Sequence, residues 1–269
     1  MNIKELKLTC YKMRKTILET SFNCRESAHI GGALSMVEIL AVLYHKIMKI
    51  NLKNPKDRFI LSKGHGFLGL LSVLESKKII NKKILDTFQT DRSEIIAHPI
   101  MDPSIGIETS NGSLGQGLSY GVGLAIAYKL QNKSNSIFVM LGDGECYEGS
   151  IWEAAITATE KKLNNLTVLL DVNGFQNDGK IGEGMDFKNL ASKWKGFGWN
   201  TILCDGHKLE LIISSFKKLK KNKPNIIIFE TTKGKGVDFM ENNNDWHHGR
   251  ITKNIYQNAL KSLKKKYVY

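Results

Sequence analysis

IFVMLGDGECYEGSIWEAAITATEKKLNNLTVLLDVN, residues 137–173, is the stretch that decides the fold of this chain. Residues 137–141 form a short, continuous apolar run, which is typical of a strand buried on both faces, and residues 166–172 are predicted to be a second such strand. The segment between them, residues 150–163, is predicted to be a helix. A strand, a helix and a strand at this spacing predict a right-handed βαβ unit in a parallel sheet.

The rest of the chain extends this unit without a repeat or a low-complexity linker. A helix is predicted at residues 35–47, with Ser35 as its N-cap and Glu38 three residues later. The other predicted elements are helices near 67–76, 82–88 and 115–130, strands at 57–61, 200–203 and 226–230, a Lys-rich helix between the last two strands, and a loop through most of 87–107. The chain is therefore predicted to be one α/β domain, residues 1–269, with an open parallel sheet and helices on both faces.

Composition excludes several classes of protein. Of the 269 residues, 42% are hydrophobic and 24% are charged, which is an ordinary globular balance. No apolar run approaches the roughly 20 residues that cross a bilayer, and residues 1–9 mix charged with apolar side chains, unlike a signal peptide. The cysteines form no CxxC pair and are expected to be reduced thiols in the cytoplasm; they are Cys10, Cys24, Cys146 and Cys204.

The net charge of +13 rests on lysine, because only five of the 39 basic residues are Arg. Base readout and bidentate phosphate contacts favour Arg. The lysines gather at residues 217–223 and 261–266, which are expected to be solvated faces of helices. Attraction of phosphorylated substrates or of an acidic partner is one alternative. Binding of RNA or DNA is another, but it needs aromatic or Arg-rich grooves that the sequence does not show, so we expect no nucleic acid and no membrane partner.

Polar residues follow both strands of the central unit. Asp143 comes after residues 137–141 with a glycine on either side, and Asn173 follows residues 166–172. Because the carboxyl ends of parallel strands meet at one edge of a sheet, we expect these two side chains to lie close together. An Asp carboxylate, an Asn amide oxygen and a backbone carbonyl are hard ligands that suit Mg²⁺ or Ca²⁺ bridging a diphosphate. Gly144 would let backbone N–H groups approach the anion closely.

Gly-Asp-Gly at 142–144, followed after 28 residues by Asn173, is the thiamine-diphosphate-binding motif, and the sequence between them resembles transketolase. Four other stretches carry the same resemblance: RESAHIGGALSMVEILAVLY (25–44), DRFILSKGH (57–65), SNGSLGQGLSYGVGLAIA (110–127) and KGKGVDFMENNNDWHHG (233–249). The likeness is to the N-terminal, pyrophosphate-binding domain of transketolase and covers nearly the whole chain. It implies the fold of that domain.

The resemblance also implies a second polypeptide. The pyrimidine-binding domain of transketolase, with the glutamate that activates the cofactor's aminopyrimidine ring, has no counterpart in this sequence. The chain therefore resembles the N-terminal subunit of a split transketolase. Its expected partner is a C-terminal, pyrimidine-domain subunit, in an α2β2 assembly.

The resemblance assigns expected roles to particular residues. Asp143, Asn173 and the backbone carbonyl of Phe175 would bind the metal, Mg²⁺ with Ca²⁺ as a possible substitute. Asn173 would also contact the cofactor. The other expected cofactor contacts are His65, Gly112, Ser113, Leu114, Gly144, Glu148 and His247, with Glu148 facing the partner's catalytic glutamate. Structural interpretations stay open: Asp143 or Ser113 as a helix cap, and Glu148 as a carboxylate favoured by a helix dipole.

Histidines are the expected catalytic residues. By resemblance, His29, His98 and either His247 or His248 contact substrate oxygens; Trp246 favours His247 and Gly249 favours His248. Each of these histidines has the alternative of a hydrogen-bonding role within its loop. His45, inside a predicted helix, and His207, in a turn, are expected to be structural. Glycines 115, 117, 121 and 123 are expected to allow close packing of their helix.

The expected activity is transfer of a two-carbon ketol group between sugars or sugar phosphates, with thiamine diphosphate and Mg²⁺. Two alternatives are kept. One is a decarboxylating carboligase of the deoxyxylulose-phosphate synthase type, which the pattern of Glu145 and Glu148 disfavours. The other is a non-catalytic, basic module that binds nucleic acid.

Overall fold

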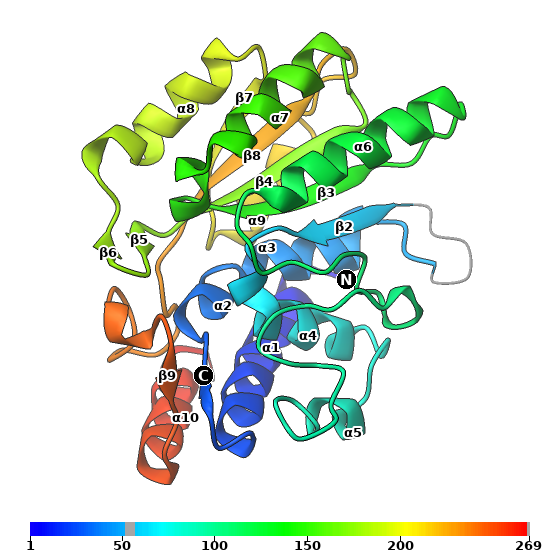
Figure 1. Ribbon diagram of the computed structural model, residues 1–269. Helices are drawn as coiled ribbons and strands as arrows, with labels where there is room; N and C mark the ends of the chain where they lie inside the picture. The colour runs from blue at the N-terminus through cyan, green and yellow to red at the C-terminus, as the bar shows by residue number, and fades with distance from the viewer. Residues whose placement is uncertain (52–56, 268–269) are drawn as a thin grey trace.

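Five parallel strands form the central sheet of the computed structural model, which describes residues 1–51 and 57–267 (Figure 1). In spatial order they are β2 (Arg58–Leu61), β3 (Ile137–Gly142), β4 (Leu166–Val172), β8 (Asn225–Glu230) and β7 (Asn200–Asp205). Every neighbouring pair is parallel, so the carboxyl ends of the strands share one edge. The predicted α/β class with an open parallel sheet is confirmed.

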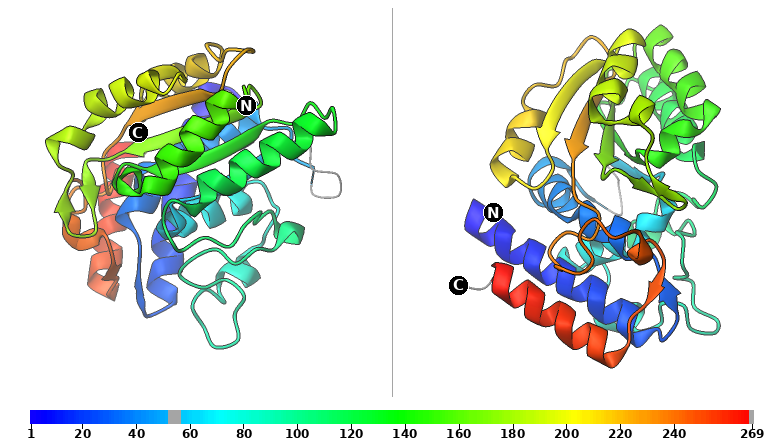
Figure 2. Two further views of the ribbon diagram at one scale, coloured as in Figure 1. Left: turned by 45° about the horizontal axis from the view of Figure 1, so that its top comes forward. Right: turned by 90° about the vertical axis from the view of Figure 1, so that its left-hand side faces the viewer.

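Helices cover both faces of this sheet (Figures 1 and 2). One face packs against α6 (Gln116–Leu130), α7 (Gly149–Glu160) and α8 (Phe187–Gly196), and the other against a group that includes α3 (Val37–Val42) and α9 (Leu209–Phe216). Along β3, Val139 and Leu141 belong to the core beneath α6, α7 and α8. Phe138 and Met140 belong to the core on the opposite face, beneath α3 and α9. Because both faces of the strand are buried, its sequence is apolar throughout.

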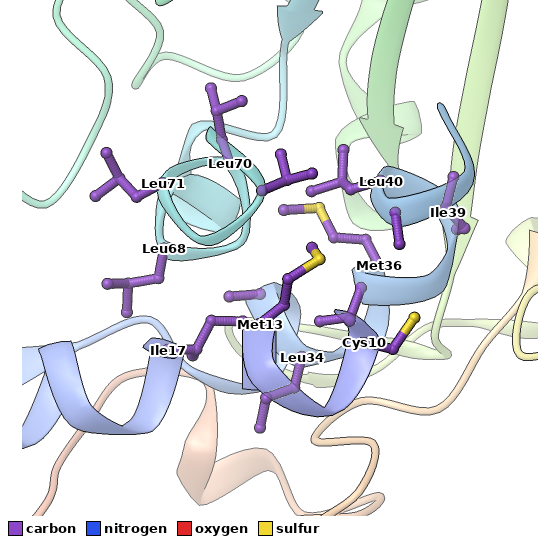
Figure 3. Close-up of a cluster of buried hydrophobic side chains, with 14 of the residues drawn as sticks. Cys10, Met13, Ile17, Leu34, Met36, Ile39, Leu40, Leu68, Leu70 and Leu71 are labelled. Carbon is purple, nitrogen blue, oxygen red and sulfur yellow. The ribbon is translucent and has the colours of Figure 1, made fainter. Parts of the chain in front are cut away.

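A layer of helices packs beyond the second face. It contains α1 (Ile3–Asn23), α2 (Gly31–Ser35), α4 (Phe67–Ser76) and α10 (Lys253–Tyr267), and α1 lies beside α10. Figure 3 shows the core of this layer, where Met13, Met36 and Leu40 are buried together. Fully burying one such side chain stabilises a fold by about 1.5–3 kcal/mol. The layer is therefore a firm support for the loops that leave it.

Short elements carry the connecting loops. The most consequential is an antiparallel pair of β1 (Ser27–Ala28) and β9 (Gly249–Arg250), which joins segments from opposite ends of the chain. The remaining ones are η1 (Leu43–Ile47), η2 (Gly64–Gly66), α5 (Lys82–Leu85), η3 (Pro103–Ile105), η4 (Gly144–Tyr147), β5 (Phe175–Gln176), β6 (Gly179–Lys180), η5 (Glu183–Met185) and η6 (Asn244–Trp246). No helix within the described residues is both long and apolar enough to cross a membrane.

Three local predictions are wrong. Ser35 does not cap a helix: it ends α2, and its hydroxyl donates to Asp171 in the sheet, 2.6 Å away. The lysines at 217–223 do not lie on a helix, because α9 ends at Phe216 and they follow in the turn toward β8. Gly123 faces open space, although Gly117 and Gly121 do pack closely, against Ser62 and Val139.

Candidate active site

The predicted metal ligands lie together at the carboxyl edge of the sheet. Gly142 and Asp171 are opposite each other in the β3–β4 pair, so Asp143 and Asn173 leave the sheet side by side. Asp143 accepts hydrogen bonds from the backbone N–H groups of Gly144, at 2.9 Å, and Gly174, at 2.7 Å. Asn173 Oδ1 accepts from the N–H of Phe175 at 3.1 Å. Two tight turns thus hold hard oxygen atoms at one place.

A cavity of about 240 Å³ opens at this point. Its lining includes eight of the predicted site residues: His65, Leu114, Asp143, Gly144, Glu148, Asn173, Phe175 and His247. A Cβ atom on Gly144 would lie 2.9 Å from Cβ of Gln176, so only glycine fits between the two turns. The carboxyl-edge residues that the sequence singled out therefore share one pocket.

Burial gives Asp143 an unusual protonation equilibrium. Removal from water, together with the nearby charge of Asp171, raises the pKa of the Asp143 carboxyl to about 7. The two backbone N–H donors and Lys63 oppose this shift without cancelling it. A positive ion beside Asp143 would favour its charged form, so the position suits a cation.

Lys63 and Asp171 form a fully buried ion pair behind this cavity, at 2.5 Å. Asp171 also accepts from the hydroxyl groups of Ser35, at 2.6 Å, and Thr231, at 2.5 Å. Burial acts to raise the pKa of Asp171, but Lys63 and these donors lower it overall. Sequence reasoning missed both members of the pair. The signal was available, because a carboxylate inside a buried strand requires a partner.

The imidazole rings of His65, His98, His247 and His248 surround that of His29. Their ring centroids lie 6.0, 5.2, 5.5 and 4.6 Å from the centroid of His29, in that order. The β1–β9 pair sets Ala28 opposite Gly249 and so brings His29 beside His248, while His65 and His98 reach the cluster from other loops. The structure thus brings all five predicted site histidines together.

Several of these histidines are held neutral. Burial, reinforced by the neighbouring histidines and Lys233, lowers the pKa of His29 to about 3. Burial and the charges of Lys233 and Lys63 lower the pKa of His247 to about 4, and burial also lowers the pKa of His65 and His98. Among the described residues, Nδ1 of His29 is buried and has no hydrogen-bond partner. A neutral imidazole with a free nitrogen is suited to a substrate hydroxyl or carbonyl.

His247 and His248 occupy different positions. The ring of His247 stacks on His65 at 5.4 Å, and its Nδ1 lies 2.9 Å from Nζ of Lys233. The ring of His248 is nearer to His29. Lys233 also donates to Asn244, at 2.6 Å, and burial beside Lys63 lowers its pKa to about 8. Lys233 is a further residue that sequence reasoning missed.

The turn before α6 reaches the same region. Gly115 has φ of +83° and is the N-cap of α6, so the alternative of Ser113 as the cap is wrong. The N–H of Gly115 donates to Glu145 at 2.9 Å, and the hydroxyl of Ser62 donates to the same carboxylate oxygen at 2.5 Å. Glu145 therefore ties this turn to β2 and β3. Glu148, which lines the cavity, is exposed, and so are Gly112 and Ser113 in the turn before α6.

His45 and His207 lie outside the cluster. Nε2 of His45 is 2.9 Å from the hydroxyl of Ser76. His207 lies between Glu38, at 3.1 Å, and the N–H of Thr232, at 2.8 Å. Both make contacts within the protein framework, as expected for structural histidines.

Residues 12–269 match the family described as transketolase, thiamine diphosphate binding domain. The chain belongs to this family. Two similar proteins are an apulose-4-phosphate transketolase subunit of Phocaeicola vulgatus, 38% identical over 98% of this chain and 95% of that protein, and the 6-deoxy-6-sulfo-D-fructose transketolase subunit SqwG of a Clostridium species, 38% identical over 88% of each. The structure of transketolase from Campylobacter jejuni superposes with a TM-score of 0.85 at 28% identity. The superposition includes all of this chain and 43% of the Campylobacter jejuni chain. The match to the family confirms the predicted resemblance.

The residues of this transketolase-family chain fit thiamine diphosphate, which the family description names, and the divalent cation that the sequence resemblance implies. Asp143, with its raised pKa, offers a buried carboxylate to a dication. Lys233, whose pKa is lowered to about 8, offers an ammonium group whose charged form an anion such as a diphosphate would favour. Gly144 lines the cavity, so the backbone of its turn would face that anion. The donor set is thus suited to a divalent cation together with a polyphosphate.

Proposed function

We propose that this chain, residues 1–269, is the pyrophosphate-binding domain of a two-chain transketolase that uses thiamine diphosphate and Mg²⁺, and forms one of its two kinds of subunit. The reaction is transfer of a two-carbon ketol group between sugars or sugar phosphates. One observation carries the proposal. Asp143 and Asn173, after β3 and β4, line the same cavity as His65, which belongs to the histidine cluster. Membership of the transketolase family supports the chemistry.

Asp143, Asn173 and the carbonyl of Phe175 would hold Mg²⁺ in this proposal. When bound, thiamine diphosphate supplies a nucleophilic carbon and an electron sink for cleavage of the C–C bond beside a carbonyl. His65, Lys233, Gly144 and Asn173 would hold its diphosphate. Lys63 stabilises the bound diphosphate indirectly. Its ion pair with Asp171 compensates the negative charge of that carboxylate, which would otherwise repel the anion.

His29, His98 and His248 would contact the substrate. Their neighbourhood keeps His29 and His98 neutral near pH 7, so each can donate or accept one hydrogen bond. Donors placed where the charge on oxygen changes contribute most to lowering the barrier. We assign His248 to this group because its ring is nearest to His29, and His247 to the cofactor side because it stacks on His65. This assignment is our proposal for the choice between His247 and His248 that the sequence left open.

The pyrimidine-domain subunit would cover the mouth of the cavity. Leu114 and Glu148 line this cavity and are half-buried and exposed, respectively, and Gly112 and Ser113 are exposed in the turn just before Leu114. We propose that Glu148 meets the catalytic glutamate of the partner there, in an α2β2 assembly. The names of the two similar subunits support the need for a second chain. A cytoplasmic location is part of the proposal and is supported by the free thiols of all four cysteines.

Calorimetry on the two-chain complex tests the metal site. We expect Asp143→Asn to weaken magnesium-dependent binding of thiamine diphosphate about 100-fold or more, because it removes the anionic ligand. Asp178→Asn is the matched control, since Asp178 borders the same cavity but is exposed. Unchanged affinity of the Asp143 variant, or a loss confined to the Asp178 variant, would refute the ligand assignment.

A further inference from the structure

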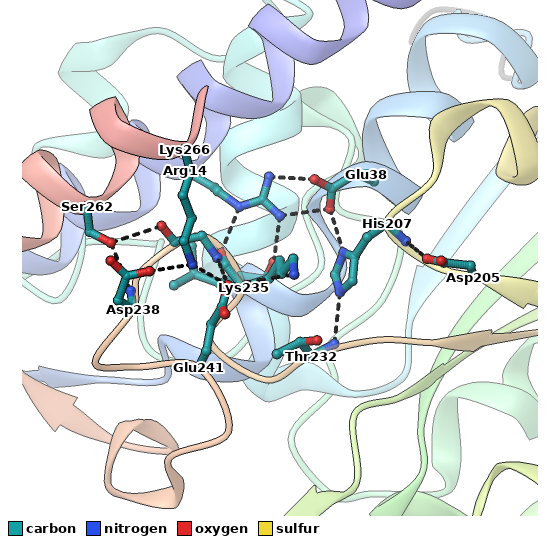
Figure 4. Close-up of polar contacts among 12 residues, drawn as sticks. Arg14, Glu38, Asp205, His207, Thr232, Lys235, Asp238, Glu241, Ser262 and Lys266 are labelled. Carbon is teal, nitrogen blue, oxygen red and sulfur yellow. Dashed lines mark hydrogen bonds and ion pairs between the residues drawn. The ribbon is translucent and has the colours of Figure 1, made fainter. Parts of the chain in front are cut away.

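A buried polar network anchors the loop that carries Lys233 and His247, and it lies outside the cofactor cavity (Figure 4). Arg14, from α1, forms an ion pair with Glu38 of α3 at 2.7 Å, and its Nε donates to the backbone carbonyl of Lys235 at 2.8 Å. Nδ1 of His207, which follows β7, lies 3.1 Å from the same Glu38. The network thus joins the helical layer, the sheet and this loop.

His207 has a different partner on each ring nitrogen. The backbone N–H of Thr232 is a donor, so Nε2 of His207, 2.8 Å away, must accept and carries no proton. Nδ1 therefore carries the proton and donates to Glu38. The N–H of His207 itself donates to Asp205 at 2.9 Å, which fixes the backbone of the turn. The ring is held in one orientation and one tautomer.

Thr232 lies between two residues that contact the site. The hydroxyl of Thr231 donates to Asp171, the partner of Lys63. Nζ of Lys233 lies against His247 and Asn244. Three consecutive residues after β8 are thus fixed by three separate contacts. The middle one, from the Thr232 amide to His207, connects this segment to the turn that follows β7.

We propose that His207 is a positioning residue, which acts through the amide of Thr232 to hold Lys233 in line with His247. His207 touches neither the cavity nor the site histidines. The inference rests on the proposed function for its effect on the cofactor, but its structural part stands on this geometry alone. The functional contribution of His207 is the acceptor nitrogen and not the bond to Glu38. Glu38 already has two contacts with Arg14, at 2.7 and 2.8 Å.

Two substitutions separate these contributions. Gln at position 207 can place an acceptor oxygen near the position of Nε2, whereas Asn can reach only the position of Nδ1. His207→Gln should therefore keep the Thr232 contact and lose the Glu38 contact, and His207→Asn should do the reverse. His45→Gln is the matched control, because His45 is a partly buried histidine remote from this loop.

The variants are compared with wild type as complexes with the pyrimidine-domain subunit. We expect His207→Asn to raise the Kd of thiamine diphosphate at saturating Mg²⁺ by about 10- to 100-fold, since small misplacements of site groups have effects of this size. His207→Gln and His45→Gln should stay within about threefold of wild type. Equal losses for Gln and Asn, or a larger loss for Gln, would overturn the proposal.

Hydrogen exchange of the chain without cofactor gives a second, independent measurement. Residues 231–249 should exchange about tenfold faster in His207→Asn than in His207→Gln, because one anchoring hydrogen bond is lost. If wild type fails to bind thiamine diphosphate, the proposed function fails, while this comparison still decides the positioning role. Unchanged exchange in His207→Asn would refute that role, even if the variant were less stable to heat.

Discussion

The pKa values of Asp143 and Asp171, two carboxylates near the site, are shifted in opposite directions, and the difference comes from their hydrogen-bond and ion-pair partners. Asp143 and Asp171 are both buried. Asp171 has an ammonium group and two hydroxyl donors, so its pKa is lowered despite burial. Asp143 has backbone N–H donors but no cation in direct contact, so its pKa is raised to about 7. The charged form of Asp143 is therefore incompletely stabilised, and Asp143 is the carboxylate better suited to bind an added cation.

The buried histidines predict a dependence of stability on pH. Burial lowers the pKa of His65 in the folded chain well below 6.5. As the pH falls below about 6.5, the unfolded chain therefore binds a proton that the folded chain does not, and the folded state loses stability. Between pH 7.5 and 5.5 this contribution amounts to roughly 1 kcal/mol.

Substitution of His65 should remove this contribution. We expect the free energy of unfolding of His65→Gln, measured in urea at pH 7.5 and 5.5, to fall by roughly 1 kcal/mol less than that of wild type over the same interval. If the two proteins lost stability in parallel, His65 would be protonated equally in the folded and unfolded chains, contrary to its burial.

Helix α6 shows how glycines in one element take different roles. Gly117 is pressed against β2, and a Cβ atom there would lie 2.5 Å from Cβ of Ser62 and 2.7 Å from its Cα. Gly123 is exposed, and apart from its own stretch of α6 no atom of the described residues lies within 4 Å of the corresponding position. Both residues lie on one helix, so their intrinsic helix propensities are the same and only their surroundings differ.

Alanine at these two positions should have opposite effects. Gly123→Ala should raise the free energy of unfolding by about 1 kcal/mol, because alanine favours a helix interior over glycine. Gly117→Ala should lower it by about 1–3 kcal/mol, because the backbone of β2 must move. Urea unfolding of both variants checks this, and stabilisation by Gly117→Ala would show that α6 and β2 are not in close contact.

The molecule places its chemistry at one edge of the sheet and leaves that edge partly exposed. The helical layer, in which α1 and α10 lie side by side (Figure 2), supports the loops that leave it. The exposed positions at the mouth, including Tyr147 at 52% exposure and its neighbour Glu148, lie beside the cavity. The arrangement is consistent with a second chain completing the site.

Mixing experiments test this at the scale of the assembly. The purified chain alone should catalyse no ketol transfer, and addition of the pyrimidine-domain subunit should restore activity up to equal molar amounts. Light scattering should give the mass of two copies of each chain. Excess Asp143→Asn chain should inhibit the mixture, because it competes for the partner without binding Mg²⁺. Full activity of the single chain would contradict the two-subunit proposal.

Sequence alone was sufficient for the sheet, the family and the residues at the strand ends. Unbroken apolar runs specify buried parallel strands, and Gly142-Asp143-Gly144 with Asn173 specifies where they end. These features depend on residues close together in the chain, or on one spacing that a regular βαβ unit fixes. The predicted set of five site histidines also gathers in one place, although their roles remain predictions.

Only the tertiary structure decided which residues hold that edge together. Lys63 with Asp171, Lys233 with His247, and His207 with Thr232 are pairs from distant parts of the chain or from a folded loop. Likewise, Ser35 looked like a helix cap from its neighbours, yet it bonds to a residue 136 positions away. Local sequence patterns indicate backbone conformation and burial. The partner of a buried polar group depends instead on which segments the fold brings into contact.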